Sequence, residues 1–293
     1  MSAEAAEHKS PLRISLRRFM RNELALACMA VVLLFAAACI VGPWLLKADP
    51  AEQFLEKGFQ APSARNWLGT DALGRDLLVR CLMGGRISLA VGLVGTLVSV
   101  VIGVAYGATA GYLGGRTDDL MMRFVDVLYG LPYMLFVVLI MAVLGRDIAP
   151  AQRILAMFIA LGAVQWLTMA RIVRGEVVAL KEKEFVEAAR ATGARWFRIV
   201  FRHIIPNLAG VVTVYATLTV PAIMLQEAFL SFLGLGVQPP LPSWGSLIRD
   251  GAEVMGHYTW LLVFPGAMFT IVLFALNFIG DGLRDAFDPQ MQG

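Results

Sequence analysis

Charged residues and cysteines are scarce in this chain. Asp, Glu, Lys and Arg make up only 16% of its 293 residues, whereas 58% are hydrophobic, and the mean hydropathy is +0.69. This composition is too apolar for an ordinary water-soluble globule. The three cysteines (Cys28, Cys39 and Cys81) provide neither a disulfide framework nor the spacing of a metal site. A net charge of +3 spread over many loops does not suggest nucleic acid as a partner.

The sequence also lacks a phosphate-binding loop. None of its five lysines follows a glycine in the G-x-x-x-x-G-K-[ST] register, so we expect no ATP and no other cofactor on this chain. Catalytic groups are equally hard to find. The candidate side chains lie in three separate loops, without metal or nucleophile spacing: Asp71, Asp76, Asp118, Asp119 and His257. We therefore expect no catalytic residue, and a membrane enzyme is the least favoured interpretation.

Long apolar runs are what the sequence does contain. A helix needs about 20 apolar residues to cross roughly 30 Å of hydrocarbon. Six runs approach or exceed this length, near residues 24–46, 87–112, 126–144, 154–170, 208–230 and 260–279. The sequence thus predicts an all-α polytopic protein of the lipid bilayer with about six transmembrane helices.

The first run is expected to be retained as a span. Its 23 uncharged residues exceed the usual core of a signal peptide, and no small-x-small cleavage site closes it before Pro43 and Trp44. The expected segments are therefore an N-terminal part, the first helix, an outer loop, a transmembrane core that includes a charged loop at 171–207, and a tail: 1–23, 24–46, 47–86, 87–279 and 280–293.

Lys and Arg set the expected orientation. With both ends inside, the inner segments carry 16 of the 25 basic residues and the outer segments carry 9. Basic residues accumulate on the cytoplasmic side of membrane proteins. The sequence therefore predicts that both termini and the loop 171–207 are cytoplasmic.

A stripe of small residues runs along the second span. They recur at every fourth position, which removes bulky side chains from one helix face and allows a neighbouring backbone to approach closely: Gly95, Ser99, Gly103, Gly107, Gly111 and Gly115. Ordinary helix packing is the simpler interpretation. A smooth seam along which helices slide is the alternative.

Prolines and acids inside the spans are candidates for the pore or its gate. Pro132, Pro221 and Pro265 each remove a helical hydrogen bond, so a kink or local unwinding is expected at each. Glu227, close to the end of the fifth span, is a candidate because an acid within the membrane is costly. Asp126, at the start of the third span, is a similar case. A structural or interfacial role is the alternative for both acids.

Residues 184–207 form a charged segment between two spans. Phe185, Ala188, Ala189 and Thr192 share one face of a predicted helix, and Gly193 is the natural corner after it, because glycine adopts a left-handed conformation at low cost. A second helical piece follows, with Trp196, Ile199 and Val200 on one side, and Pro206 is expected to stop it and open the fifth span. Such a helix pair either docks on a partner or rests on the lipid surface.

The residues of this segment resemble a known family. Glu187-Ala188-Ala189, Gly193 and the block ending in Pro206 are similar to the EAA loop of the membrane subunits of binding-protein-dependent ABC importers. His203 and Ile205 depart from the generic pattern but match the variant of the peptide and nickel permease subgroup. Further segments resemble the C-type permease subunits of oligopeptide importers, and nearly as closely those of dipeptide importers: 69–80, 84–92, 111–123, 166–175, 227–245 and 277–289.

The resemblance implies a type I importer fold in a bacterial inner membrane. It implies that the segment couples to an ATP-binding subunit through Glu187, Ala188, Ala189, Arg190, Gly193 and Pro206. It also implies a homologous B subunit that completes the pore, two ATP-binding subunits that carry ATP and Mg, and an extracytoplasmic substrate-binding protein. Oligopeptides are the expected cargo, with dipeptides, glutathione or a nickel complex as alternatives.

A secondary carrier driven by an ion gradient is the alternative from another class. It would predict an internal repeat and ion ligands within the membrane, and neither is evident in the sequence.

Overall fold

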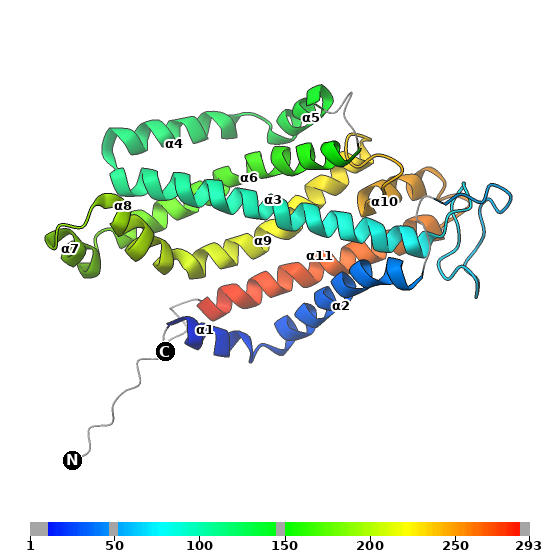
Figure 1. The fold of residues 1–293 in the computed structure, drawn as a ribbon, viewed down its shortest axis with the longest axis horizontal. Coiled ribbons are helices and arrows are strands. Elements are labelled where there is room, and N and C mark those ends of the chain that lie inside the picture. The colour runs from blue at the N-terminus through cyan, green and yellow to red at the C-terminus, as the bar shows by residue number, and fades with distance from the viewer. Residues whose placement is uncertain (1–10, 47–51, 145–149, 288–293) are drawn as a thin grey trace, which may run out of the picture.

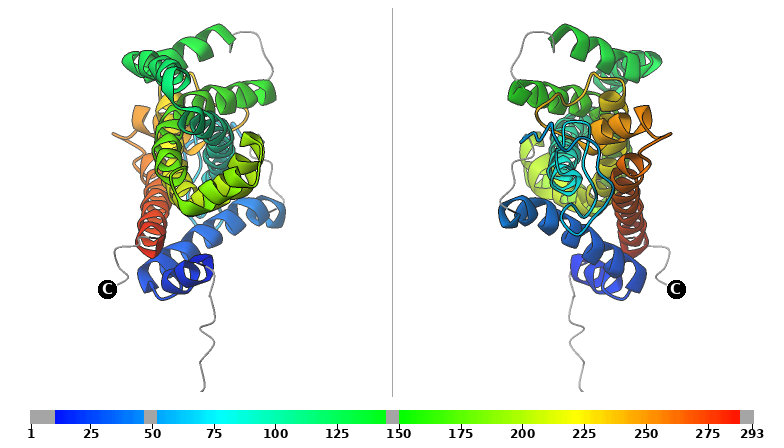
Figure 2. Two further views of the ribbon diagram at one scale, coloured as in Figure 1. Left: turned by 90° about the vertical axis from the view of Figure 1, so that its left-hand side faces the viewer. Right: turned by 90° about the vertical axis from the view of Figure 1, so that its right-hand side faces the viewer.

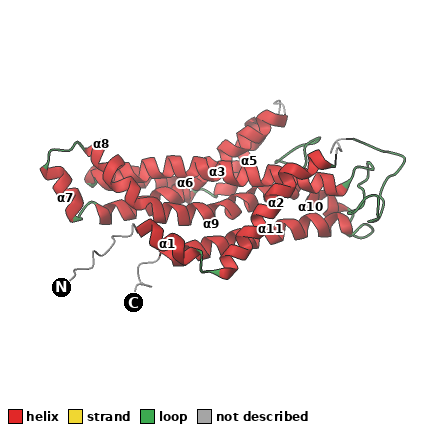
Figure 3. Cartoon of the chain, turned by 60° about the horizontal axis from the view of Figure 1, so that its bottom comes forward, coloured by secondary structure: helices red, strands yellow, loops and turns green. Residues whose placement is uncertain are grey.

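The computed structural model describes residues 11–46, 52–144 and 150–287 as an elongated bundle of helices (Figure 1). Figure 3 shows the same bundle with helices in red and a long loop beyond one end. Among the described residues the only strand-like pairing is an isolated bridge between Thr70 and Asp76. The helices are α1 Pro11–Phe19, α2 Glu23–Leu45, α3 Leu77–Leu113, α4 Gly115–Gly130, α5 Tyr133–Leu144, α6 Pro150–Leu180, α7 Glu184–Ala191, α8 Trp196–Ile199, the π-helix η1 Val200–Ile204, α9 Ile205–Phe232, α10 Trp244–Glu253 and α11 Trp260–Phe287.

Five helical stretches in the described residues are long and apolar enough to cross a membrane: Glu23–Leu45, Leu77–Leu113, Ile154–Leu180, Trp196–Phe232 and Trp260–Phe287. A sixth span results if α4 and α5 are counted together. The all-α membrane architecture predicted from the sequence is therefore confirmed, with five to six spans.

The helix of the second span is longer than the apolar run that predicted it. It begins at Leu77 rather than near residue 87, because Asp76 caps it by accepting a hydrogen bond from the Val79 amide at 3.1 Å. Ten residues of the loop expected over 47–86 are thus helical. Arg80 and Arg86, which interrupt the apolar run, lie inside this helix.

Proline acts differently in the three spans that contain it. Before Pro132 the chain leaves the helical conformation at Leu131 (ψ 138°), which separates α4 from α5. Both α9 and α11 instead continue through Pro221 and Pro265 without a break in the helix. Of the kink or local unwinding expected at each proline, unwinding is therefore found at Pro132 and not at Pro221 or Pro265.

The glycine stripe of α3 is a seam against α6. A Cβ atom at Gly111 would lie 2.8 Å from the carbonyl oxygen of Arg174, and one at Gly107 would collide with the carbonyl oxygen of Ala170. These contacts are to backbone, which cannot move aside as a flexible side chain can. Gly115 lies outside the seam, because it begins α4 with φ +53°, and a Cβ atom added there would have no neighbour within 4 Å.

The two ends of the bundle carry different elements. Helix α1, the C-terminal end of α11 and the hairpin of α7 and α8 lie at one end, on the left in Figure 1. The loop 52–76 and α10 lie at the other. The end-on views in Figure 2 show α4 and α5 on one side of the bundle and α1 with α2 on the opposite side.

Candidate functional site

Helix α7 ends in a left-handed turn at Gly193. The glycine has φ +76°, its amide donates to the carbonyl oxygen of Arg190 at 2.9 Å, and the amide of Ala194 donates to that of Ala189 at 3.1 Å. This pair of hydrogen bonds is a Schellman motif, which closes a helix and redirects the chain. The corner predicted at Gly193 is therefore confirmed.

The face of α7 that was predicted to seat against another surface is divided in the structure. Val186 and Ala189 are buried in the chain's own core, in a cluster with residues of α3, α6, α8 and α9. Ala188 and Thr192, expected on the same face as Ala189, are exposed instead. The buried side chain of Ala189 thus helps to attach α7 to the rest of this chain.

The outward side of α7 is available for contact. Glu187, Ala188 and Arg190 are all exposed, and Phe185 is 39% exposed. Glu187 and Arg190 also line a shallow hollow of about 290 Å³ together with Lys181 and Glu182. The exposed surface of α7 therefore has a small side chain, Ala188, at its centre and charged side chains around it.

A set of polar contacts fixes the base on which α7 sits. Lys181, just after α6, donates from Nζ to the carbonyl oxygen of Gly111 at 3.0 Å. About two helical turns earlier, Arg174 pairs with the buried Asp118 at 2.5 Å. The guanidinium of Arg190 lies 5.5 Å from the ring centre of Tyr112. The ends of α3, α4, α6 and α7 are therefore held together.

Pro206 does not stop the helix that follows Gly193. Helix α8, η1 and α9 form one continuous stretch from Trp196 to Phe232. The amide of Ile205 bonds to the carbonyl of Val200, five residues back, so the turn before Pro206 is widened. A wider turn relieves the clash between a proline ring and the preceding turn. The predicted helix stop at Pro206 is thus wrong, and a π-helical turn precedes it instead. The predicted place of Pro206 in the first turn of the fifth span is confirmed, because α9 begins at Ile205.

Aromatic side chains cover the outside of this second piece. Ile199 and Val200 are buried, as parts of the same core that holds α7, whereas Trp196 is 45% exposed. The Trp196 ring packs edge-on against the Phe197 ring. The ring centres of Phe197 and Phe201 are 4.4 Å apart. Trp196 was expected to share a face with Ile199 and Val200, and it points away from them.

Glu227 is wholly buried within this subunit, so it does not face a pore in the isolated chain. Its carboxylate accepts hydrogen bonds from the hydroxyls of Ser88 at 2.8 Å and Ser231 at 2.7 Å. Ser88 in turn accepts from the Trp244 amide at 3.3 Å, and Ser243 donates to Ser231 at 3.2 Å. This Glu227 network joins α3, α9 and the start of α10.

The other pore candidates occupy unlike positions. Pro221 and Pro265 are buried between helices, and Pro132 is exposed at the break between α4 and α5. Asp126, also exposed, pairs with Arg171 of α6 at 2.6 Å. The structure therefore does not bring the predicted pore residues together at one place.

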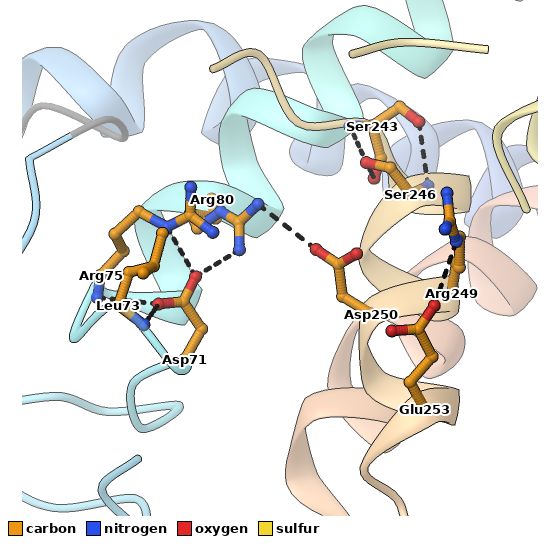
Figure 4. A network of polar contacts seen from close by, with 9 residues as sticks. All are labelled: Asp71, Leu73, Arg75, Arg80, Ser243, Ser246, Arg249, Asp250 and Glu253. Carbon is orange, nitrogen blue, oxygen red and sulfur yellow. Dashed lines mark hydrogen bonds and ion pairs between the residues drawn. The ribbon is translucent and has the colours of Figure 1, made fainter. Parts of the chain in front are cut away.

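A second charged cluster, drawn in Figure 4, lies where the loop 52–76 meets α3 and α10, at the end of the bundle opposite α7 in Figure 1. The buried Asp71 of the loop 52–76 accepts from Arg75 at 2.7 Å and also pairs with the buried Arg80 of α3. Arg80 reaches Asp250 of α10 more loosely, at 3.6 Å. Burial raises the pKa of the Asp250 carboxyl, against the opposing effect of Arg80. A hollow of about 280 Å³ separates the loop from α10.

Sequence reasoning missed the serines around Glu227 and the Asp71 cluster. Ser231 follows Glu227 by one helical turn, so its proximity was readable from the i, i+4 spacing. No sequence signal points to Ser88, which lies on another helix.

Comparison with known proteins places this arrangement in a family. Residues 99–293 match the family described as binding-protein-dependent transport system inner membrane component, and residues 10–62 match the N-terminal TM domain of oligopeptide transport permease C. The oligopeptide transport system permease protein OppC of Haemophilus influenzae is 49% identical over 94% of this chain and 87% of its own length. The dipeptide transport system permease protein DppC of Bacillus subtilis is 44% identical over 94% of this chain and 85% of its own length.

A solved structure shares the fold. In an inward-facing structure of the MetNI methionine ABC transporter, one chain superposes with a TM-score of 0.56 at 20% identity, covering 72% of this chain and 96% of that one. The helical bundle is therefore that of a type I ABC importer permease. From the match over two thirds of its length, the chain belongs to the family of binding-protein-dependent transport system inner membrane components, as a multi-pass permease subunit.

Proposed function

We propose that this chain is the C-type permease subunit of an importer of peptides, and that α7 couples it to an ATP-binding subunit. The names of its relatives, which are oligopeptide and dipeptide permeases, support the substrate class. The observation that carries the coupling is the placement of α7: an exposed helix held rigidly at one end of the bundle through Val186, Ala189 and the turn at Gly193.

Rigid attachment suits a coupling element. A force applied to the exposed side of α7, at Glu187, Ala188 and Arg190, passes directly into the core shared by α3, α6 and α9. A small residue at Ala188 leaves room for a close approach by a partner surface. Closure of two ATP-binding subunits, which carry ATP and Mg, would then reorient the spans, and hydrolysis would return them.

The remaining partners follow from the family and from the two ends of the bundle. We place the α7 end, both termini and residues 171–207 in the cytoplasm, as the distribution of Lys and Arg favours. A homologous B subunit would complete the pore, and a substrate-binding protein would approach the end that carries the loop 52–76 and α10.

The coupling role is tested by replacing Ala188 with tryptophan. We expect Ala188→Trp to abolish co-purification of the ATP-binding subunits, because a large ring on the contact surface prevents close approach. The matched control is Ala61→Trp, which places the same ring at an exposed alanine in the loop at the far end. Equal recovery of ATP-binding subunits with both variants would rule out docking on α7.

The substrate class and energy source are tested by uptake into vesicles that contain the complete complex. Peptides of two to five residues should accumulate only when ATP is supplied. Accumulation by this chain alone, driven by a proton or sodium gradient, would favour the secondary carrier. Cysteine probes give the orientation: Arg190→Cys should react only from the cytoplasm and Gly58→Cys only from outside.

A further inference from the structure

Helix α1 is amphipathic and lies at the end of α2. One of its apolar side chains, Phe19, is buried against α2 and the C-terminal end of α11, in a cluster with Ala25, Ile279 and Ala286. Gly282 of α11 allows this close packing, because a Cβ there would lie 3.5 Å from the Phe19 ring and 2.6 Å from Ala25. The position of α1 relative to the spans is therefore fixed by side-chain packing.

The apolar face of α1 extends beyond the part that Phe19 buries. Leu16, one turn before Phe19, is 59% exposed, and Met20, which directly follows the last residue of α1, is 62% exposed. Leu24, at the start of α2, is 56% exposed. Helix α2 buries only Ala25, Cys39 and Pro43 in this subunit. The apolar side of α1 is thus continuous with the exposed apolar surface of a span.

The basic side chains of this region form no ion pair with the residues that the structure describes. Arg17 and Arg21 are exposed, and Arg18 is half-buried. No carboxylate among the described residues lies within ion-pair distance of any of the three. Within residues 11–46, 52–144 and 150–287, these three cations therefore lie without a counter-charge next to the start of a span.

We propose that α1 is an interfacial anchor that binds anionic phospholipid. Leu16 and Met20 enter the boundary between head groups and acyl chains, while Arg17, Arg18 and Arg21 contact the head-group phosphates. An amphipathic helix with arginines on its polar face lies in the plane of the interface in this way. A membrane leaflet presents acyl chains for the apolar side chains and phosphates for the arginines at the same depth. A second protein would have to match both surfaces next to a helix that faces lipid.

The depth of α1 is tested with fluorescent probes on the full-length chain in lipid nanodiscs, in a background with Cys28, Cys39 and Cys81 replaced. Probes at Leu16→Cys and Met20→Cys should be quenched by lipids brominated on the acyl chains, and a probe at Arg17→Cys should not. Quenching that is absent at Leu16, or equal at all three positions, would overturn the placement of α1.

The lipid preference is tested by the amount of phosphatidylglycerol retained by the purified chain, relative to phosphatidylcholine. Each basic residue near an anionic surface contributes about 1 kcal/mol, so removing two should weaken retention roughly tenfold or more. The variant is Arg17→Gln/Arg21→Gln, and its charge-matched control is Arg116→Gln/Arg123→Gln, two exposed arginines of α4. Equal retention by both double variants, or probe quenching without any preference for phosphatidylglycerol, would overturn the assignment to anionic head groups.

Discussion

Ser88 and Glu227 are 139 residues apart in the sequence, yet the Ser88 hydroxyl donates to the Glu227 carboxylate at 2.8 Å. This bond connects α3 to α9 inside the bundle. Because Ser88 also accepts from the Trp244 amide, the same hydroxyl holds the first residue of α10. The Glu227 network is therefore a structural junction of three helices.

Replacement of Glu227 should show its structural weight. Glu227→Leu leaves the hydroxyls of Ser88 and Ser231 buried without an acceptor, and each such loss costs about 1–3 kcal/mol. We expect a destabilisation of about 2–6 kcal/mol, measured as a lower Tm in detergent. Glu227→Gln should cost less, because the amide keeps one carbonyl acceptor. The control, Glu253→Leu, removes an acid whose side chain is 63% exposed, and a Tm as low as that of Glu227→Leu would contradict the argument.

Gly193→Val should uncouple transport without preventing insertion. A β-branched side chain at φ +76° is strained, although there is space for it, since no atom lies within 4 Å of the added Cβ. We expect normal membrane level and normal pairing with the B subunit, but loss of uptake. Gly58→Val is the matched control, because Gly58 also has a positive φ and open surroundings but lies in the outer loop. Normal uptake by Gly193→Val at normal expression would refute the docking role of α7.

The seam between α3 and α6 should not tolerate even one methyl group. Gly107→Ala places a Cβ against the carbonyl of Ala170 and 3.0 Å from the amide nitrogen of Arg174, so the two backbones must separate. Overpacking of this kind costs about 1–3 kcal/mol. Thermal unfolding should therefore occur at a lower temperature. Gly175→Ala, on the open side of α6, has no neighbour within 4 Å and should be neutral or stabilising.

The stability of the second charged cluster, formed by Asp71, Arg75, Arg80 and Asp250, should depend on Asp71 far more than on Asp250. Loss of Asp71 leaves the buried Arg80 without its close partner, and breaking a buried pair costs about 3–5 kcal/mol. Asp250 is 54% exposed and 3.6 Å from Arg80, so its loss should cost under about 1 kcal/mol. Proteolysis of the loop 52–76 measures both effects. Similar cleavage rates for Asp71→Ala and Asp250→Ala would contradict this ranking.

Features governed by local backbone chemistry were predictable from the sequence. The turn at Gly193 was expected because glycine favours a positive φ, and the spans were expected because their apolar runs are long. The EAA pattern could also be recognised from the sequence, because its residues all lie within the short segment 187–206. The buried face of α7 was harder to predict from the sequence, because Ala188 and Ala189 are chemically identical and only tertiary packing decides which of them is buried.

Features that depend on contacts between distant segments were not predictable. Nothing in the sequence near Ser88 indicates that it bonds to Glu227. The continuation of the helix through Pro206 depends on a widened turn, which the usual rule for proline does not anticipate. The early start of α3 was missed because Arg80 and Arg86 shorten the apolar run, although Arg80 is neutralised by Asp71 from another segment.

The interlocked backbones of α3 and α6 also determine how far a displacement at α7 travels. We expect two helices whose main chains approach this closely along a seam to tilt together. At 1.5 Å per residue, the 37 residues of α3 span roughly 55 Å. A tilt of about 5°, applied at the end that carries α7, would displace the opposite end by roughly 5 Å over this length. By removing side chains from one face of α3, the glycines thus allow a small tilt at the end that carries α7 to become a large displacement at the opposite end of the bundle.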